Sequence, residues 1–530
     1  MAAVVLCLGV TLAAAQASDP ADEAFAAGDY DRALDLYDQR LTQDPDDVAA
    51  LVRSAQLLSW QSRFDEALAR YDRALVLDPA SPQARLERAK VLSWDGQLEP
   101  AVEAYRAYLD DHADDVDARV GLAATLSWLR RFEESRTEFE RVIEVHPGRV
   151  DALVGMARTY AWAGELGEAR EWYERALSVE PGNKDARLGL AYLDLWSGAP
   201  ELAARSAAEL ERAHPGDADV LELAQRARAD SGPRAEAGLE HIDDTDDNEL
   251  NVLRLSGSLP VAPLRVGASY AHYDLANDPA DASASIDSFF VNASWNLSRS
   301  QSLGLSIGVD RNDNDIDDEH HTEPLGEAVY TWGLDRPFRI MASAGRQALR
   351  YSPVITSNNI RFDYVTLATT GRVGGNWTVF GSIGAADVTD DNDRIEAIAG
   401  FDYPLREQEP RLDLGFTLRL LDYGEDTDSG YFDPQNFRSA LGRAGTGGDF
   451  GARGYTWSVQ LQAGPQSFTL GGVDTDHDFV TVVNGTLGAP LGRGFVLELR
   501  AGWGDYAAQT AGGFESREIA LGLSWRGGGK

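Results

Sequence analysis

Two different periods of apolar residues divide this chain into two parts. In the second part, Leu412–Leu420 carry an apolar side chain at every second position, with polar or small residues between them. The same alternation recurs in Phe495–Trp503 and in Ile519–Trp525. A period of two is that of an extended strand with one apolar and one polar face. The second part of the chain is therefore predicted to form β-strands.

The connections between these predicted strands alternate in length. The short ones are 260–263, 298–300, 335–337, 372–375, 406–409 and 488–492. The longer ones, which are rich in Asp and Asn, are 274–286, 310–319, 347–359, 387–393 and 422–436. Short turns on one rim and long polar loops on the other are typical of bacterial outer-membrane barrels, in which closure leaves no unpaired strand edge. We expect about sixteen antiparallel strands between Ala235 and Trp525, with both ends of the barrel on the periplasmic side.

The first part of the chain repeats with a period of thirty-four residues, which is the tetratricopeptide period. The period relates five tryptophans: Trp60, Trp94, Trp128, Trp162 and Trp196. Small residues recur where two helices must approach closely: Ala55, Ala89, Ala123, Ala157 and Ala191. We expect about five and a half repeats, followed by a polar capping helix near 217–229.

These patterns give a domain organisation with four parts. Residues 1–17 contain an apolar run that ends in a small-x-small site, so they are predicted to be a secretory signal peptide. Residues 18–230 are predicted to be a periplasmic α-solenoid, 231–234 a short linker, and 235–530 the outer-membrane barrel. Cys7 is the single cysteine and lies in the predicted signal segment, so the mature chain has no disulfide or thiolate chemistry.

The recurring tryptophans have two interpretations. Each lies away from the centre of the apolar stripe of its helix, so packing on the following repeat is one interpretation. The other is an aromatic ladder along the groove of the solenoid. A partner helix or a sugar chain could stack on such a ladder, because indole offers an apolar face and a hydrogen-bond donor.

Charged and amide residues between the apolar strand positions are the candidates for lining a lumen. A charge facing lipid at the membrane midplane costs about 2–4 kcal/mol, so these residues are expected to point inward. The charged candidates are Arg254, Arg265, Arg339, Arg361, Asp363, Glu396, Asp402, Asp413, Arg419, Glu498 and Arg500, with Glu518, Asn292, Gln460 and Gln462 beside them. They fit a hydrated pore for a hydroxyl-rich polymer, or they pair with one another and stabilise a plugged barrel.

Composition and motifs exclude several classes of function. The net charge of −38 argues against nucleic acid as a partner. Nucleophile-elbow, phosphate-loop and His-Glu-x-x-His motifs are absent, so we expect no enzyme, no catalytic residue and no cofactor. The acidic loops 243–247 and 310–318 could hold calcium, but they lack the pattern of an EF-hand, which favours a solvated acidic rim and no metal site.

One string in a long loop is more specific than the rest. It runs Ser429-Gly430-Tyr431-Phe432-Asp433-Pro434-Gln435-Asn436-Phe437, and Gly464-Pro465-Gln466-Ser467-Phe468 follows downstream. Here the chain resembles the barrel of the bacterial cellulose synthase outer-membrane subunit and the related YaiO-type barrels. The family positions are Gly430, Tyr431, Phe432, Pro434, Gln435 and Phe437. The layout of repeats followed by a barrel is also similar to that of the poly-N-acetylglucosamine export porin.

The resemblance implies an exopolysaccharide secretion porin in the outer membrane of a Gram-negative bacterium. The repeats would bind the periplasmic synthesis machinery or the nascent polymer, and the barrel would conduct the polymer outward. The chain has far fewer repeats than the cellulose subunit, which weakens that particular assignment. The alternative is an outer-membrane scaffold, in which a closed barrel anchors repeats that bind a periplasmic protein. A plain solute porin is a third possibility.

Overall fold

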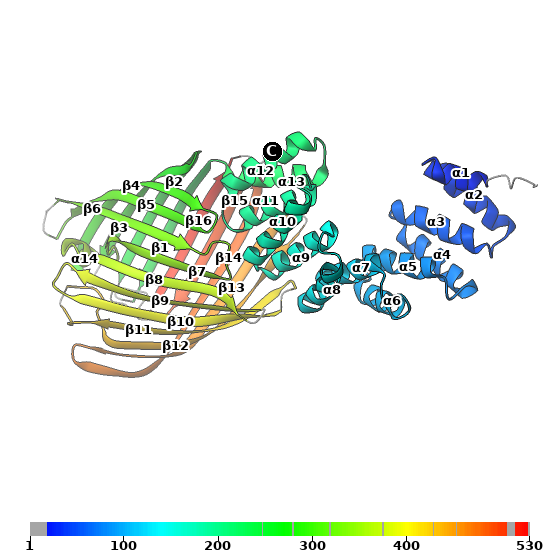
Figure 1. Cartoon of the computed structure of the whole chain (residues 1–530). Helices are drawn as coiled ribbons and strands as arrows, with labels where there is room; N and C mark the ends of the chain where they lie inside the picture. Colours follow the sequence, from blue (N-terminus) through cyan, green and yellow to red (C-terminus); the bar gives the residue numbers. More distant parts are fainter. Residues whose placement is uncertain are drawn as a thin grey trace, which may run out of the picture. The chain divides into compact units, whose positions relative to one another are not determined.

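The computed structural model describes residues 19–245, 247–277, 280–316, 320–373, 376–406, 408–427, 429–451, 453–505 and 515–527. The predicted signal peptide, residues 1–17, lies outside the described residues, and so does Cys7. The chain divides into two compact units, one ending at Ala163 and the other beginning at Gly164. The division falls within the helical repeats, so the last helices form one unit with the barrel (Figure 1).

The first unit consists of helices in antiparallel pairs. Its helices are α1 (Pro20–Ala26), α2 (Tyr30–Gln43), α3 (Val48–Trp60), α4 (Phe64–Leu77), α5 (Pro82–Trp94), α6 (Leu98–Asp111), α7 (Val116–Trp128), α8 (Phe132–Val145) and α9 (Val150–Ala163). The thirty-four-residue period is also the period of the helix caps. The side chains of Asp47, Ser81 and Asp115 each accept a hydrogen bond from the backbone N–H three residues later, which starts α3, α5 and α7.

The core of the repeats is built from small residues and buried rings. Tyr71 and Phe139 are almost fully buried between helices. At three repeats the ring of a second helix lies directly over a glycine of the next first helix: Tyr105 over Gly121, Phe139 over Gly155 and Tyr173 over Gly189. A Cβ at Gly155 would lie 2.3 Å from the Phe139 ring, so only glycine allows this approach.

The second unit begins with the last helices of the repeats. These are α10 (Leu166–Val179), α11 (Lys184–Trp196), α12 (Pro200–Ala213) and α13 (Ala218–Ser231). They contact the barrel through ion pairs: Glu201 of α12 lies 3.2 Å from Arg265 of the barrel, and Asp194 of α11 lies 3.2 Å from Arg299. The end of the helical region is thus joined to the barrel by contacts as well as by the chain.

Within the described part of the chain, sixteen antiparallel strands close into one barrel, as predicted (Figure 1). They are β1 (Arg234–Asp244), β2 (Asn248–Val261), β3 (Leu264–Asn277), β4 (Ala282–Ser298), β5 (Gln301–Asn314), β6 (His320–Trp332), β7 (Phe338–Ala348), β8 (Arg361–Val373), β9 (Trp377–Val388), β10 (Asp393–Arg406), β11 (Arg411–Tyr423), β12 (Gln435–Phe450), β13 (Tyr455–Leu470), β14 (Val473–Gly492), β15 (Phe495–Gly504) and β16 (Ser516–Arg526). Each strand pairs with its neighbours in sequence, and β1 pairs with β16 to close the ring. We call the end where β1 begins the proximal end, and the opposite end the distal end.

The outward face of the barrel is apolar. On β5, Leu305, Ile307 and Val309 point outward and are exposed, while Ser306 and Asp310 point inward. Exposed outward-facing rings gather near the proximal end: Trp295, Trp332, Phe338, Trp377, Phe450 and Phe495. An apolar outer face with a belt of aromatic rings at its edge is the surface that a membrane barrel presents to lipid. Separately, no helix in the described part of the chain is both long and apolar enough to cross a bilayer.

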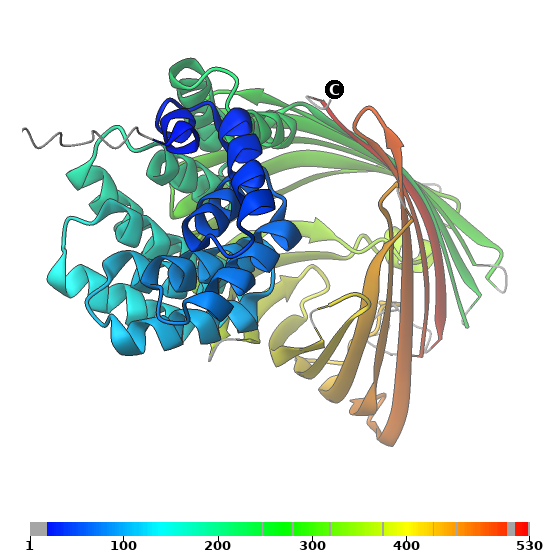
Figure 2. The same cartoon turned by 90° about the vertical axis from the view of Figure 1, so that its right-hand side faces the viewer.

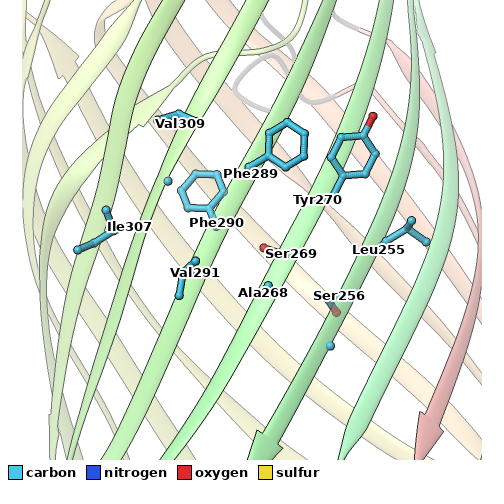
Figure 3. Close-up of a pocket in the computed structure, with 12 residues that line it drawn as sticks. Leu255, Ser256, Ala268, Ser269, Tyr270, Phe289, Phe290, Val291, Ile307 and Val309 are labelled. Atoms are coloured by element: carbon cyan, nitrogen blue, oxygen red, sulfur yellow. The ribbon is translucent and has the colours of Figure 1, made fainter.

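One hollow belongs to this outer face. It has a volume of about 610 Å³ and spans strands β2 to β5 (Figure 3). Outward-facing Leu255, Tyr270, Phe289 and Ile307 border it, and the small residues Gly257 and Ala268 form part of its lining. Because its walls are apolar and face outward, this hollow suits lipid chains.

Candidate functional site

The register of the strands places most of the predicted lumen residues on the inward face of the barrel. Directly paired residues of antiparallel strands point to the same side of the sheet. Residues on the other face of the sheet from the exposed apolar residues therefore point inward. They include Arg254, Arg265, Arg339, Glu396, Asp402, Asp413, Arg419, Glu498 and Arg500.

Asp363 departs from that prediction. It lies on the same face of β8 as the exposed Val365 and Leu367, and its carboxylate pairs at 2.6 Å with Arg346, a residue that also points outward. The prediction was wrong for Asp363 because a charge is excluded from the outer face only at membrane depth, and Asp363 lies near the distal end of its strand. Arg361 begins the same strand, but its guanidinium pairs at the distal rim with Glu323, which is directly paired with the inward-facing Asp310.

Many of the inward charges form ion pairs with one another. On the side of β10 to β12, Glu396 accepts hydrogen bonds from Arg419 at 2.6 Å and from Arg394 at 2.7 Å. Arg443 donates to Asp402 at 2.8 Å. These pairs join neighbouring strands of the wall, and the Glu396 carboxylate is shared by two guanidinium groups.

The distal half of the lumen contains an insert that the sequence analysis did not predict. The connection from β7 to β8 carries a short helix, α14 (Pro353–Ser357), that packs against β3, β4 and β5. Figure 2 shows this yellow-green helix inside the ring of strands. Arg350 anchors the segment, because its Nε donates to the buried Asp310 of β5 at 2.6 Å. The predicted polar loop is therefore folded back into the barrel.

The family motif packs against this insert. Tyr431 and Phe437 lie in one buried cluster with Ile355 and Ile360 of the insert and with Phe362 of β8. The cluster also contains Val388, Leu421, Tyr423, Leu441, Phe468, Val480 and Val482. The amide of Asn358 donates to the backbone oxygen of Ser429 at 2.9 Å. The motif residues thus help to fill one side of the distal lumen.

The remaining motif residues shape the loop. Gly430 has a φ of +86°, and a Cβ there would lie 2.8 Å from Val354, so a side chain would be both strained and crowded. Phe432 packs its ring edge-on against Phe437 and Phe468. Pro434 lies just before β12, where its backbone oxygen accepts from Tyr423, and Gln435 begins that strand.

We expect the motif loop to become less stable as the pH rises from about 4 towards neutrality. Asp433 is buried, and its carboxylate accepts hydrogen bonds from the N–H and the hydroxyl of Thr427, both at 2.7 Å. Burial raises the pKa of Asp433 above its ordinary value, and the Thr427 hydrogen bonds only partly oppose this. The folded loop therefore binds the proton more tightly than the unfolded loop does, so the stabilisation is complete in acid and is lost as the pH rises through the folded pKa.

Hydrogen exchange of residues 424–434 at a series of pH values, corrected for the intrinsic exchange rate, measures this effect. Asp433→Asn keeps an oxygen that can accept from Thr427 but cannot ionise. The variant is expected to show protection that no longer depends on pH. Equal pH dependence in the two proteins would assign the effect to another group.

The five tryptophans are all partly exposed, between 39% and 48%. Trp60 contacts the rings of Phe25 and Tyr30, which belong to the preceding pair of helices and not to the following one. In the second unit, Trp196 contacts Tyr192 of its own helix. Each of the five indoles therefore keeps part of its surface accessible.

The first helices of the repeats lie on the inner side of the stack in the first unit. Consecutive first helices α3, α5, α7 and α9 contact one another, whereas successive second helices approach less closely. On α5, the exposed Trp94 lies on the same helix face as Gln83, Glu87 and Lys90.

The sequence analysis did not predict a buried ion pair in the last repeats, although the sequence contains a signal for it. Asp194 stands where the earlier repeats have Leu58, Leu92, Leu126 and Tyr160, and Arg170 stands where they have Leu68, Val102 and Arg136. A charged residue at a buried position of a repeat requires a partner. Arg170 donates to Asp194 at 2.7 Å, and Asp194 is also the partner of Arg299 in the barrel.

Comparison with known proteins identifies the helical part. Models of the tetratricopeptide repeat match residues 24–91 and 163–227, and another model of the same repeat matches residues 129–186. A comparison with curated proteins finds no match.

Several solved structures are similar to parts of the chain. A bacterial polysaccharide outer membrane secretin shares 13% identity, with coverage of 56% of this chain and 98% of that chain and a TM-score of 0.45. A tetratricopeptide repeat protein from Parabacteroides merdae shares 19% identity, with coverage of 39% and 82% and a TM-score of 0.37. PilW, a type IV pilus biogenesis factor, shares 19% identity, with coverage of 38% and 94% and a TM-score of 0.35. The chain thus joins tetratricopeptide repeats to a closed antiparallel barrel of the outer-membrane type.

Proposed function

We propose that this protein exports an exopolysaccharide through the outer membrane. In this proposal the repeats lie in the periplasm and bind the synthesis machinery or the nascent polymer, and the barrel conducts the polymer outward. The observation that carries the proposal is the lumen: a closed barrel with an apolar outside encloses a polar inward face that leaves open cavities.

The chemistry of the lumen supports a hydroxyl-rich cargo. A cavity of about 510 Å³ is lined by Glu236, Arg254, Ser269, Glu498 and Arg500. Carboxylates accept hydrogen bonds and guanidinium groups donate them, so such a wall can replace the water around sugar hydroxyls. The half-exposed tryptophans of the repeats add apolar ring faces, on which a sugar ring or an apolar partner side chain can stack.

The insert in the distal lumen favours a second candidate. If the insert with α14 stays in place, the barrel is closed and serves as an anchor for repeats that bind a periplasmic protein. The apolar cluster around Tyr431 and Ile355 gives this alternative its physical basis. The two functions differ in whether the barrel conducts once the insert is displaced.

Planar-bilayer conductance of the purified full chain distinguishes the two functions. We expect little current from the protein as it stands, and a clear, stable increase when residues 350–359 are replaced by a short glycine-serine linker. The reason is that this segment carries the contacts of Arg350 and Ile355 that fill the distal lumen. A matched control keeps residues 350–359 and replaces only the partly exposed Ser357 with alanine, which leaves the contacts of Arg350 and Ile355 in place.

Absence of current in every variant, with the barrel folded, would contradict export and support the anchored scaffold. A second measurement uses cells: deletion of the gene is expected to abolish release of polymer into the medium, and the full chain is expected to restore it. Normal release from the deletion strain would also contradict export.

A further inference from the structure

The hollow of about 610 Å³ on the outer face of the barrel, which we call the outer hollow, has a floor of small residues. Gly257 of β2 is directly paired with Ala268 of β3, and both share the outward face with exposed apolar residues. Val291 stands beside this pair, and the rings of Tyr270 and Phe289, with centroids 4.9 Å apart, close the distal side (Figure 3). A Cβ at Gly257 would meet no atom closer than 3.7 Å, so the space outside this glycine is open.

The positions of residues along β4 give the depth of the outer hollow in the membrane. Val291 is four residues and Asp287 is eight residues from Trp295, one of the exposed rings near the proximal end. With a rise of about 3.4 Å per residue and a strand tilt of about 45°, these residues lie about 10 Å and about 19 Å beyond Trp295. The apolar band of such a barrel is about 25 Å tall. The outer hollow therefore lies near the middle of the band, and Asp287 lies near its distal surface.

Polar side chains face outward at the distal edge of the outer hollow. His272, Asp287 and Arg311 each lie two positions from a residue of the hollow on β3, β4 and β5, so they share its outward face. Asp287 accepts a hydrogen bond from the Tyr270 hydroxyl at 2.7 Å and lies 2.9 Å from His272 Nδ1. The Arg311 side chain is 64% exposed, and its contact with Asp313 is long, at 3.9 Å. The Arg311 guanidinium can therefore donate to an anion that lies beside the barrel at this edge.

Two carboxylates stand one step further out on the same face. Asp274 is two positions beyond His272 on β3, and Asp313 is two positions beyond Arg311 on β5. His272 Nε2 lies 3.1 Å from Asp274, and His320 Nδ1 lies 2.7 Å from Asp313. Each carboxylate has a second oxygen that can accept from a further cation. From the middle of the membrane towards its distal surface, the order of groups is therefore an apolar hollow, a guanidinium and a pair of carboxylates.

We propose that the outer hollow and the polar residues distal to it bind one molecule of phosphatidylethanolamine. An acyl chain fills the hollow, the phosphate accepts hydrogen bonds from Arg311, and the amine, which lies outside the phosphate, donates to Asp274 and Asp313. The order of chain, anion and cation in this lipid complements the order of groups along the barrel. A lipid with a phosphate and no amine would place its negative charge beside two carboxylates. The inference requires a barrel that meets lipid, but it does not require the export function.

Native mass spectrometry of the purified full chain, titrated in detergent with defined lipids, measures this binding. We expect phosphatidylethanolamine to bind about tenfold more tightly than phosphatidylglycerol with the same acyl chains. Arg311→Gln is expected to weaken the binding of phosphatidylethanolamine by about tenfold, because it removes the charged donor to the phosphate. Asp274→Asn combined with Asp313→Asn is expected to remove the preference between the two lipids. Arg346→Gln is the control, because it removes an outward guanidinium that is already paired with Asp363.

Gly257→Leu tests the hollow itself, because the new side chain occupies the space above the floor and is expected to abolish binding of the lipid. Gly442→Leu is the matched control: Gly442 also faces outward, on β12, and a Cβ there would likewise lie 3.7 Å from the nearest atom. Heat-modified migration on a gel verifies that each variant is folded.

Three results would overturn the inference. The first is equal affinity of the unmodified chain for the two phospholipids. The second is binding that survives Gly257→Leu or that falls equally in the two glycine variants. The third is displacement of phosphatidylethanolamine by a lower concentration of lipid A, which would assign the outer hollow to a phosphorylated glycolipid. The preference of the unmodified chain is measured without any substitution, so the test does not depend on the folding of a variant.

Discussion

Replacing Asp194 with alanine is expected to destabilise the unit that begins at Gly164 by about 3–5 kcal/mol, because it leaves a buried cation without its partner. The Asp194 side chain is 1% exposed and accepts a hydrogen bond from Arg170 at 2.7 Å. The remaining side-chain nitrogens of Arg170, Nε and Nη1, are buried and have no hydrogen-bond partner. Loss of the carboxylate therefore leaves the whole guanidinium group uncompensated, and it also removes the partner of Arg299 in the barrel.

Hydrogen exchange of α10 to α13, combined with urea unfolding of the full chain in detergent, measures this loss. Asp185→Ala is the control on the same helix, because the Asp185 side chain is 53% exposed and its ion pair with Lys184 is long, at 4.0 Å. An exposed pair of this kind contributes at most about 1 kcal/mol. If the two variants lose the same stability, the ion pairs of Asp194 do not hold the last repeats to the barrel.

A positive charge at Ile307 is expected to destabilise the barrel in a bilayer by about 2–4 kcal/mol, whereas the same charge at Ser306 is expected to have little effect. Ile307 is 72% exposed and lies on the outward face of β5. Ser306 is its neighbour in sequence, points into the lumen, and donates a hydrogen bond to Asn292 at 2.7 Å. The two positions share a strand and a depth in the membrane, and they differ in the face on which the new side chain lies.

Folding of Ile307→Arg and Ser306→Arg into lipid vesicles, followed by urea titration, gives the two free energies of unfolding. The side chain of Ser306→Arg enters a lumen cavity of about 400 Å³ that Asn292 and Glu327 also line, so water and the Glu327 carboxylate can solvate it. Equal stability of both variants would show that the outer face does not meet lipid. Because the export proposal requires a membrane barrel, that result would remove its basis.

Both predictions concern how the last repeats and the barrel are held in place. The ion pairs at Asp194 attach the last repeats to the barrel, and the apolar outer face fixes the barrel in its membrane. The division between Ala163 and Gly164 places the earlier repeats, with Trp60, Trp94, Trp128 and Trp162, in a separate unit.

The local features of this protein were determined by its sequence alone. The alternation in Leu412–Leu420 indicates a strand with one apolar and one polar face. The same pattern recurs often enough along the chain to predict the barrel and its number of strands. The thirty-four-residue spacing from Trp60 to Trp94 reports a pair of helices for the same reason. Periodicity is a local property of the backbone, so it can be seen without knowledge of distant contacts.

Only the tertiary structure decided what fills the lumen and where the charges face. Asp363 was expected inside, but the rule that excludes charge from the outer face holds only at membrane depth, and strand ends extend beyond it. The insert around Ile355 depends on residues from β3, β5 and the loop at Tyr431, which are far apart in sequence. The pairing of Asp194 with Arg170 and Arg299 likewise joins three separate segments. Alternation along a strand reveals which residues share a face of the sheet. It does not reveal which distant residues they contact, because those contacts form only when all the strands close into the barrel.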